Sequence, residues 1–441
     1  MSKKQTNTFS LLHPIAAGID VGASCHYVCA GSPGNTTVRR FGTFTEDLNA
    51  LADWLCSLGV STAAMESTGI YWVNLYDVLE AKGISICLAN ARYVKNVPGR
   101  KSDVSDCQWI WQLHSFGLLK GSFIADDQIR ELRAYVRQRE SLEQQKVAQV
   151  NMMNKALQLL NIKLRQVLSK TETLVGMNII RAIADGVRDG KKLSEDYYHP
   201  QMKSSKEDLA RALHGNWKKE HLFCLRQALS CYDFIREQML LCETEMERAL
   251  DEMNGGTGKD RKKKSGRIRQ NDFAFKADEY LNSLTGIDLT EIAGLDEKTV
   301  VTIISETGTD VSKWPSARHF SSWLGLSPRP KKTGEKLRGH FKDSVAGRAG
   351  RAFKSAAVSL HHNKSSLGSF YRRIAFRKGS IAAIKATARK LAVIYWNMMS
   401  GGESYRKQTA PDYEQQQQAA QIRRLQKQAA KFGMTLQIAN T

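Results

Sequence analysis

Apolar and polar residues alternate between residues 15 and 44, and turn-forming residues interrupt the alternation twice. This period of two predicts successive strands joined by tight turns, over residues 15–21, 26–30 and 37–44. Beyond them the period switches between those of helices and strands, which predicts a helix over 46–58, a strand over 62–66, a helix over 71–81 and a strand over 84–88. The expected first domain is therefore of the α/β class.

Four acidic residues lie at informative places in this pattern. Asp20 is near the end of the first predicted strand and Glu66 ends the fourth, where an open α/β sheet tends to place its site. Asp103 and Asp106 are three residues apart at the start of a predicted helix that continues through residue 113, so both lie on one face. Three hairpin strands followed by alternating strands and helices are the element order of a ribonuclease-H-like fold, which would bring these acids together.

Carboxylates that share one place raise each other's pKa, so a cation must neutralise them. We therefore expect Asp20, Glu66, Asp103 and Asp106 to bind Mg²⁺ or Mn²⁺ for phosphodiester chemistry. Each acid also has a plainer explanation by itself, because Asp20 can cap a turn and the other three can be first-turn acids favoured by a helix dipole. The phosphate hairpin of sugar-kinase ATPases also begins Gly-Ile-Asp-Val-Gly, but the second Asp-x-Gly hairpin it needs does not follow here.

Two later stretches carry apolar residues at alternating steps of three and four. The first runs from Val150 through Leu160 and Leu164 to Val167, and the second from Leu225 to Ala249. Such spacing predicts long helices that pack along a coiled-coil seam. An intramolecular helical hairpin and a dimer interface both satisfy the pattern. Residues 171–219, between the two, are expected to form a helical insert.

The charge balance indicates the partner. The chain has 65 Lys and Arg residues and 44 acids, a formal net charge of +21, and such a surplus attracts polyanions by counterion release. Nucleic acid is expected rather than a membrane, because no apolar run reaches the roughly 18 residues of a spanning helix and the polar start is no signal peptide. The eight cysteines lack zinc-finger spacing and are expected to be buried free thiols in the cytoplasm.

Most of the positive surplus lies in residues 313–400, which hold nineteen Lys and Arg residues and two acids. Solvated helical faces usually mix both signs, so this asymmetry predicts a surface that follows phosphates. Upstream, residues 255–267 are rich in Gly and Lys and predict a basic linker. Residues 284–300 resemble a helix-hairpin-helix turn, which presents backbone N–H groups to phosphate. One later helix should bury the stripe Ile381, Ile384, Ala388, Leu391 and Tyr395.

Residues 325–339 combine hydroxyls, glycines and cations in one expected loop. Thr333 stands there among cations, which supply the positive charge that a phosphoryl-transfer nucleophile needs. A surface turn in which Thr333 bonds its own backbone is the simpler explanation of the composition alone. Nucleic-acid contacts are expected from nine basic residues of this region: Arg329, Lys331, Lys332, Lys336, Arg338, Arg348, Arg351, Lys385 and Arg389.

Four ordered motifs and the loop together resemble the DEDD transposases of the insertion-sequence one-ten family, relatives of the Piv invertases. The motifs are Gly-Ile-Asp-Val-Gly around Asp20, Met-Glu-Ser-Thr-Gly-Ile-Tyr-Trp around Glu66, Val-Pro-Gly-Arg-Lys-Ser-Asp-Val-Ser-Asp ending at Asp106, the helix-hairpin-helix-like turn, and Gly-Leu-Ser-Pro-Arg ending at Arg329. The resemblance covers about residues 14–400.

This resemblance implies a RuvC-like, ribonuclease-H-like N-terminal domain, long coiled-coil helices and a mainly helical C-terminal transposase domain. The expected divisions are a RuvC-like DEDD domain over 14–125, a coiled-coil dimerisation region over 126–253, a basic linker over 254–272, a C-terminal transposase domain over 273–402 and a Gln-rich, helical tail over 403–441. In such proteins a structured bridge RNA pairs with donor and target DNA. A homodimer, assembling into a tetramer in the synaptic complex, is implied, in the cytoplasm of a prokaryotic cell and on the nucleoid when active.

The resemblance also implies the chemistry. A Ser of the C-terminal domain attacks a backbone phosphate and forms a covalent protein–DNA intermediate, and the acids with Mg²⁺ complete the site in trans. The four acids match Asp20, Glu66, Asp103 and Asp106, but the nucleophile aligns with Thr333, whose β-methyl group restricts χ1 and crowds in-line attack. We expect Thr333 to act, with Ser327 and Ser344 as the possible substitutes.

Three functions stay open on the sequence. The first is an RNA-guided DNA recombinase with a covalent intermediate. The second is a metal-dependent, RuvC-like junction endonuclease that hydrolyses DNA and has no use for the Thr333 loop. The third is a catalytically weakened descendant that only binds nucleic acid, which the replacement of Ser by Thr favours.

Overall fold

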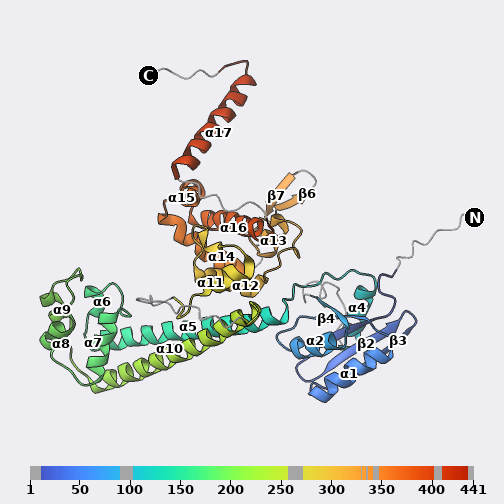
Figure 1. Ribbon diagram of the computed structural model, residues 1–441, viewed down its shortest axis with the longest axis horizontal. Coiled ribbons are helices and arrows are strands. Elements are labelled where there is room, and N and C mark those ends of the chain that lie inside the picture. Colours follow the sequence, from blue (N-terminus) through green and yellow to red (C-terminus); the bar gives the residue numbers. More distant parts are fainter. Residues whose placement is uncertain are drawn as a thin grey trace, which may run out of the picture. The chain divides into compact units, whose positions relative to one another are not determined.

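The computed structural model describes residues 11–89, 103–256, 272–328, 330–333, 336–340, 347–401 and 410–435, with only the backbone for residues 330–333, 336–340 and most of 410–417 (Figure 1). The predicted basic linker therefore lies largely outside the described residues. In the part of the chain that is described, no helix combines the length and the apolar character needed to cross a membrane.

The N-terminal region is built on a five-stranded sheet in the order β3-β2-β1-β4-β5. Strands β1, β2 and β3 are antiparallel neighbours, whereas β4 runs parallel to β1 and β5 parallel to β4. The elements are β1 (Ala16–Val21), β2 (His26–Ser32), β3 (Asn35–Phe41), α1 (Thr45–Ser57), β4 (Thr62–Glu66), α2 (Trp72–Ala81), β5 (Ser85–Ala89) and α4 (Asp103–Ser115). Each predicted element is present, with ends shifted by up to three residues, and the ribonuclease-H-like class is confirmed.

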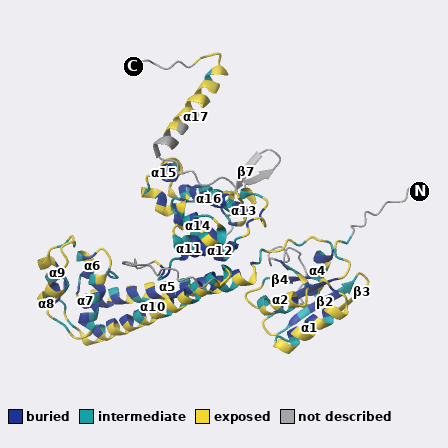
Figure 2. Ribbon diagram, viewed as in Figure 1, coloured by how far each residue is buried: buried dark blue, intermediate teal, exposed yellow. Residues whose placement is uncertain are grey.

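The central strands β1 and β4 are buried on both faces of the sheet (Figure 2), whereas β3 is largely exposed. On one face, Ile19 and Met65 pack with Leu51 of α1 and Leu75 of α2 in the main apolar cluster. On the other face, Ala64 and Ala89 pack with Ile110 of α4. Alternate residues of a strand point to opposite faces. Met65 of β4 therefore faces α1 and α2, while its neighbour Ala64 faces α4.

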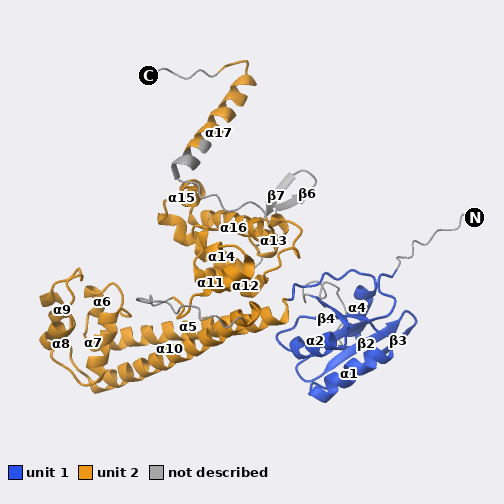
Figure 3. Ribbon diagram, viewed as in Figure 1, with its two compact units in different colours: residues 1–124 blue, residues 125–441 orange. Residues whose placement is uncertain are grey.

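The chain divides into two compact units, residues 1–124 and 125–441, which are coloured separately in Figure 3. The second unit begins with two long antiparallel helices, α5 (Asp127–Leu159) and α10 (Lys219–Met253), which lie side by side. Arg139 and Glu243, both buried, bind each other at 2.6 Å across this helical hairpin. The two helices thus pack against each other within one chain, and a dimer interface stays a prediction.

The first seam ends earlier than predicted. Helix α5 stops at Leu159, and Asn161 takes a left-handed φ of 60°, a conformation that Asn tolerates better than most residues and that a helix cannot continue through. Leu160 and Leu164 are buried, but in the cap of the hairpin rather than along the seam. This cap contains α6 (Leu164–Val167), α7 (Leu174–Ala184), α8 (Gly190–Tyr197) and α9 (Lys206–Ala212). The last three lie within residues 171–219, where the sequence predicts a helical insert.

The rest of the second unit is mainly helical, as predicted. It contains α11 (Ala277–Thr285), η1 (Leu289–Glu291), α12 (Glu297–Thr307), α13 (Ala317–Trp323), β6 (Pro330–Thr333), β7 (Lys336–His340), α14 (Arg348–Ser359), η2 (Leu360–His362), α15 (Ser366–Lys378), α16 (Ser380–Met399) and α17 (Ala410–Ala430). Its core holds Phe320, Phe353 and Tyr395, with ring centroids 5.7 to 6.4 Å apart. These rings join α13, α14 and α16.

Ion pairs attach this helical core to the hairpin. Arg137 of α5 donates two hydrogen bonds of 2.8 Å to the carboxylate of Glu306 in α12. Arg133 of α5 donates to the carbonyl of Ser305 at 2.8 Å. Bidentate geometry of this kind fixes orientation as well as distance, so the second unit forms one body through α5 and α12.

Three expectations need correction, two of them about this unit and one about the cysteines of both units. The predicted loop over 325–339 is largely the β6–β7 hairpin, in which Thr333 pairs with Lys336. Ile381, expected in the core, is 78% exposed because it lies in the first turn of α16, before the stripe that is buried from Ala388 onward. All eight cysteines are free, but only Cys29 and Cys107 are buried. The exposed ones, Cys56, Cys224 and Cys231, sit on the outer faces of α1 and α10.

The predicted helix-hairpin-helix-like turn lies between α11 and α12. Gly294, with φ of 95°, packs against η2 and α14, where a Cβ would lie 3.0 Å from Leu360 Cγ. The following helix, α12, starts with two acids. The Asp296 carboxylate accepts from the N–H of Thr299 at 2.8 Å, and Glu297, the first residue of the helix, accepts from the N–H of Asp278 in α11 at 3.3 Å. Carboxylates at this helix start disfavour a phosphate there.

Candidate active site

Asp20 and Glu66 lie on the same face of the sheet. Strands β1 and β4 pair in parallel, with Gly18 beside Ala64 and Ile19 beside Met65, so Asp20 and Glu66 occupy the next register position. Paired residues of parallel strands point the same way. Because Ala64 packs with α4, Glu66, two residues further along, also faces α4. Both carboxylates therefore stand at the ends of adjacent strands, under one helix.

Helix α4 runs antiparallel to these strands. Its end is fixed at their start, because the Nε2 of His114 lies 2.9 Å from the Oγ1 of Thr62 and the carbonyl of Ser115 accepts from the N–H of Leu12 at 2.9 Å. The beginning of α4 therefore points toward the strand ends. One helical turn rises about as far as two strand residues.

Because the rise of one helical turn matches two strand residues, the levels of the acids along β4 and α4 can be compared. Thr62 meets His114, and Ala64 packs with Ile110, one turn earlier in α4. The same step from Ala64 to Glu66 leads from Ile110 to the level of Asp106. Asp103 and Asp106 form the first turn of the helix that covers Asp20 and Glu66. Three segments distant in the sequence thus converge at one edge of the sheet.

Gly18 allows the close packing of α4 on the sheet. A Cβ at this position would run into the backbone N of Trp111 and lie 2.5 Å from the carbonyl O of Cys107. Only glycine leaves room for a helix backbone at this distance. The sequence interpretation drew attention to Asp20 in Gly-Ile-Asp-Val-Gly and overlooked the glycine two residues before it, although glycine inside a predicted strand signals such an approach.

The surroundings of the acids are well defined. Glu66 is 6% exposed, and its Oε1 accepts a hydrogen bond of 2.8 Å from the hydroxyl of Thr68. The pKa of the nearby Cys107 thiol is raised to about 12, mainly by burial and further by the charges of Cys29 and Asp20. The Asp20 carboxylate is therefore close to the second turn of α4. Thr68 is a site residue that sequence analysis missed, although it follows Glu66 within the motif.

The four acids are not gathered into one cluster. Among the described residues, no group of three or more His, Cys, Asp or Glu side chains is arranged to hold a metal ion. The register brings Asp20 and Glu66 together, and the direction of α4 brings Asp103 and Asp106 to the same edge. The donors nevertheless suit a hard divalent cation, because all are carboxylates on one face.

The other predicted site residues belong to the second unit. Thr333 ends β6, but its side chain, with those of Lys331, Lys332, Lys336 and Arg338, lies outside the described part, as do Arg329 and Ser344. The alternative hydroxyl of Ser327 lies 3.2 Å from that of Ser321.

The remaining four basic residues are described, on two helices. Arg348 of α14 binds the Glu140 carboxylate at 2.6 Å, so its charge is already paired within the protein. Arg351, in the next turn of α14, is exposed. Lys385 and Arg389 of α16 are half-buried. Their contacts with nucleic acid stay a prediction.

Two family models match the chain. A model of DEDD transposases matches residues 17–162, and a model described as "Transposase IS116/IS110/IS902 family" matches residues 287–372, so that together they cover just over half of the chain. Among solved structures, RuvC of T. thermophilus in complex with a Holliday junction substrate is similar at 15% identity, covering 25% of this chain and 100% of that chain, with a TM-score of 0.20. No curated protein matches. The two matches follow the order of the two regions described above, and the chain belongs to the IS116/IS110/IS902 family of transposases.

Proposed function

We propose that this transposase is a DNA recombinase guided by a structured bridge RNA, cutting and rejoining strands through a covalent enzyme–DNA intermediate. Membership in a transposase family already implies DNA cleavage and strand transfer. The single observation that carries the proposed chemistry is the convergence of Asp20, Glu66 and the first turn of α4 at one edge of the sheet. The guide RNA rests on the family resemblance and on the net charge of +21.

Asp20, Glu66, Asp103 and Asp106 would hold Mg²⁺ or Mn²⁺. When bound, such an ion supplies Lewis-acid stabilisation of the charge that develops on the leaving 3′ oxygen. The chain's own part is to position the carboxylates. Thr68 fixes one oxygen of Glu66 by its hydrogen bond, and Gly18 lets α4 approach closely enough to bring its acids to the strand ends.

Thr333 would be the nucleophile. Its Oγ1 forms a new ester bond to a backbone phosphorus, the strand's own ester bond to the 3′ oxygen breaks, and that oxygen takes a proton from solvent and leaves as a hydroxyl. The proton lost by Thr333 passes to solvent. Rejoining reverses these steps, because the 3′ hydroxyl of another strand attacks the enzyme ester and Thr333 recovers its proton. A covalent ester conserves the bond energy that hydrolysis would release. The acids and Thr333 belong to different compact units, and we infer assembly in trans within a dimer that pairs into a tetramer.

A metal-dependent, RuvC-like endonuclease acting by hydrolysis is the second candidate. The presence of Thr333 where the family has Ser favours it, since a β-branched side chain crowds in-line attack. In this case water attacks the phosphorus, and no protein–DNA ester forms. If the replacement of Ser by Thr333 removed cleavage altogether, the protein would bind nucleic acid without cutting it.

Replacement of Asp20 by Ala tests the acid site. We expect strand cleavage to fall by at least about a hundredfold, because a preorganised charge is lost, while binding of the copurified RNA is unchanged. Asp53→Ala is the matched control, since Asp53 lies on α1, on the opposite face of the sheet, in an exposed pair with Lys82 that contributes little. Cleavage that persists in Asp20→Ala would remove this acid from the mechanism.

The RNA that copurifies with the protein tests the guide. Sequencing should return one discrete, structured species whose loops are complementary to the DNA that is cut. A mixture of cellular RNA fragments, together with normal cleavage by the RNA-free protein, would favour the hydrolytic nuclease.

A further inference from the structure

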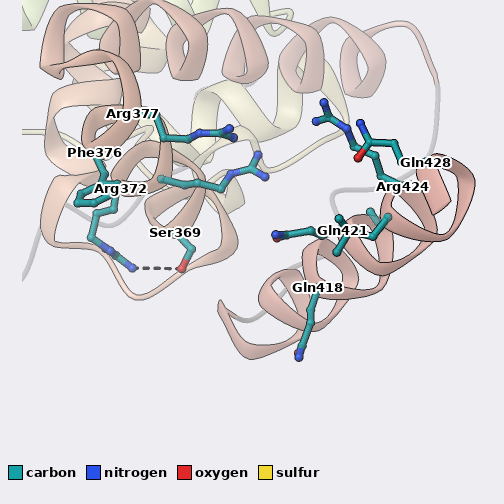
Figure 4. A pocket seen from close by; sticks show the side chains of 11 residues that line it. Ser369, Arg372, Phe376, Arg377, Gln418, Gln421, Arg424 and Gln428 are labelled. Carbon is teal, nitrogen blue, oxygen red and sulfur yellow. Dashed lines mark hydrogen bonds between the residues drawn. The ribbon is translucent and has the colours of Figure 1, made fainter. Parts of the chain in front are cut away.

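A groove of about 920 Å³ lies between α15 and α17, in the second unit (Figure 4). Helix α15 lines it with Arg372, Arg373, Phe376 and Arg377, and α17 lines it with Arg424 and three glutamines. The family model of this region ends at residue 372, so most of the groove is built by parts of the chain outside the matched regions. None of the residues assigned to catalysis lies in it.

The groove is strongly positive. Four of its eleven lining residues are arginines and none is acidic. Arg372 is held in place, because it donates to the carbonyl oxygens of His361 at 3.1 Å and Asn363 at 2.7 Å. Neither Arg377 nor Arg424 forms an ion pair with a carboxylate in the described part of the chain. The groove therefore offers a polyanion the fixed charge of Arg372 and the charges of Arg377 and Arg424.

Phe376 adds an aromatic surface to this charge. Its side chain is 95% exposed, in contrast to the fully buried Phe353 of the neighbouring core. A phenyl ring in water, flanked by arginines, is suited to stack on a planar group. Opposite it, Gln418, Gln421 and Gln428 present amides that can both donate and accept hydrogen bonds.

We propose that this groove binds an unpaired nucleic-acid strand. The arginines would hold the phosphates, Phe376 would stack on a base, and the glutamine amides would meet exposed base edges. A duplex keeps its bases stacked inside and offers none to Phe376, so it satisfies only the arginines. An acidic peptide also satisfies the charge but leaves the ring and the amides without a role. Helix α17 is exposed along nearly all of its described surface, as expected of a binding element rather than a core helix.

Binding of labelled oligonucleotides to the full-length protein, measured by fluorescence anisotropy, tests the proposal. The probes are single-stranded RNA and DNA about 12 nucleotides long and the corresponding duplex. Phe376→Ala should weaken single-strand binding about fivefold or more, the loss expected when one stacked base loses its aromatic partner. Phe376→Trp should restore it. Duplex binding should change less than twofold.

Two matched controls lie on or beside α17. Phe432 is also an exposed aromatic, at 79%, but it does not line the groove, so Phe432→Ala should bind like the wild type. Arg424→Ala should weaken single-strand binding, whereas Arg423→Ala, one residue earlier and outside the groove lining, should not. Equal effects of the paired variants, or an equal loss for the duplex, would overturn the proposal.

Crosslinking gives an independent reading, because other basic surfaces of the protein also bind nucleic acid. A strand containing 4-thiouracil should crosslink to peptides from residues 366–378 and 410–430, and absence of both would overturn the proposal. Tighter binding of RNA than of DNA would identify the guide as the source of the strand, and the reverse a displaced DNA strand. The groove is tested by binding and the proposed function by cleavage. Loss of the groove's role would therefore leave Asp20-dependent cleavage intact, and loss of cleavage would leave strand binding by the groove intact.

Discussion

Gly18 determines how closely α4 approaches the sheet, because no side chain larger than a hydrogen fits at this position. Gly18→Ala introduces a methyl group onto the backbone of Trp111 and Cys107, and α4 must shift outward. We expect a loss of about 1–3 kcal/mol in the free energy of unfolding, measured by urea denaturation, with a parallel loss of cleavage.

Gly121→Ala is the control for this change. A Cβ at Gly121 would lie 3.6 Å from the Sγ of Cys87, an ordinary contact, and its φ is not left-handed. Its stability should stay within about 0.5 kcal/mol of the wild type, as for most tolerated substitutions. If Gly18→Ala were as stable as Gly121→Ala, the inference that close packing of α4 on the sheet positions Asp103 and Asp106 would be wrong.

The hydroxyl of Thr333 distinguishes the two proposed reactions, because the covalent route needs it and hydrolysis does not. Thr333→Ala should abolish a protein–DNA adduct that survives denaturation and gel electrophoresis, because no oxygen remains to carry the ester. Thr333→Ser should keep or raise the yield of adduct, since removal of the methyl group frees χ1. An adduct in Thr333→Ala would point to Ser327 or Ser344, whereas cleavage without any adduct in the wild type would indicate hydrolysis.

At the scale of elements, α4 is held by its last turn, and this contact responds to pH. His114 is buried between Thr62 and the stacked ring of His13, whose centroid lies 4.6 Å away. Burial, and next the charge of His13, lowers the pKa of His114 to about 4 from the ordinary 6.5. Between about pH 6.5 and 4 the unfolded chain binds a proton that the folded chain does not, so the free energy of unfolding falls as the pH falls.

The expected loss from this linkage is on the order of 3 kcal/mol by pH 4. Unfolding midpoints measured from pH 7 to pH 4 should decline less steeply for His114→Gln, which cannot be protonated, than for the wild type. His362→Gln, at an exposed position, should follow the wild type. Identical slopes for all three proteins would show that His114 is not the titrating anchor of α4.

The order of elements in the N-terminal domain could be predicted because each has a clear period. Strand alternation marks β1 and β4 and places Asp20 and Glu66 at or near strand ends. Helix periods were equally clear in α5 and α10, but their spacing alone could not tell where α5 ends. Leu160 and Leu164 continue the pattern of three and four while packing in the cap instead, because the left-handed Asn161 redirects the chain between them.

Contacts made by side chains from distant segments could not be predicted from spacing. The carboxylates of Asp296 and Glu297 look like ordinary helix-start residues in the sequence. Asp296 nevertheless occupies an N–H group expected to meet phosphate, that of Thr299, and Glu297 binds the N–H of Asp278 in α11. Likewise Arg348 resembles its basic neighbours but is paired with Glu140, 208 residues away in the chain. The run that contains Phe376 and Arg377 was visible as basic, whereas the groove exists only because α17 lies beside α15.

On the scale of the whole molecule, the two units differ in net charge. Residues 1–124 hold ten Lys and Arg residues and nine acids, whereas residues 125–441 hold 55 and 35. The first unit supplies the acids of the candidate site, and residues 313–400 of the second supply most of the positive surplus. Because carboxylates dispersed along a binding surface would repel phosphate, we expect strand binding to persist in variants that lose the acids, so that cleavage and binding can be separated.

The charge distribution predicts how binding depends on salt. The logarithm of the affinity for duplex DNA should fall linearly with the logarithm of the salt concentration, with a slope near −0.9 for each phosphate neutralised. Replacing Arg351 and Arg389 by Ala should make the slope less steep by about two, if each contacts one phosphate. Replacing Lys191 and Lys192, two exposed cations of α8 in the hairpin cap, removes the same net charge and should leave the slope unchanged. Because both double variants lower the total charge equally, a difference between them can come only from where the charges sit. Equal slopes for the two, or a wild-type affinity indifferent to salt, would contradict a phosphate-binding surface on α14 and α16.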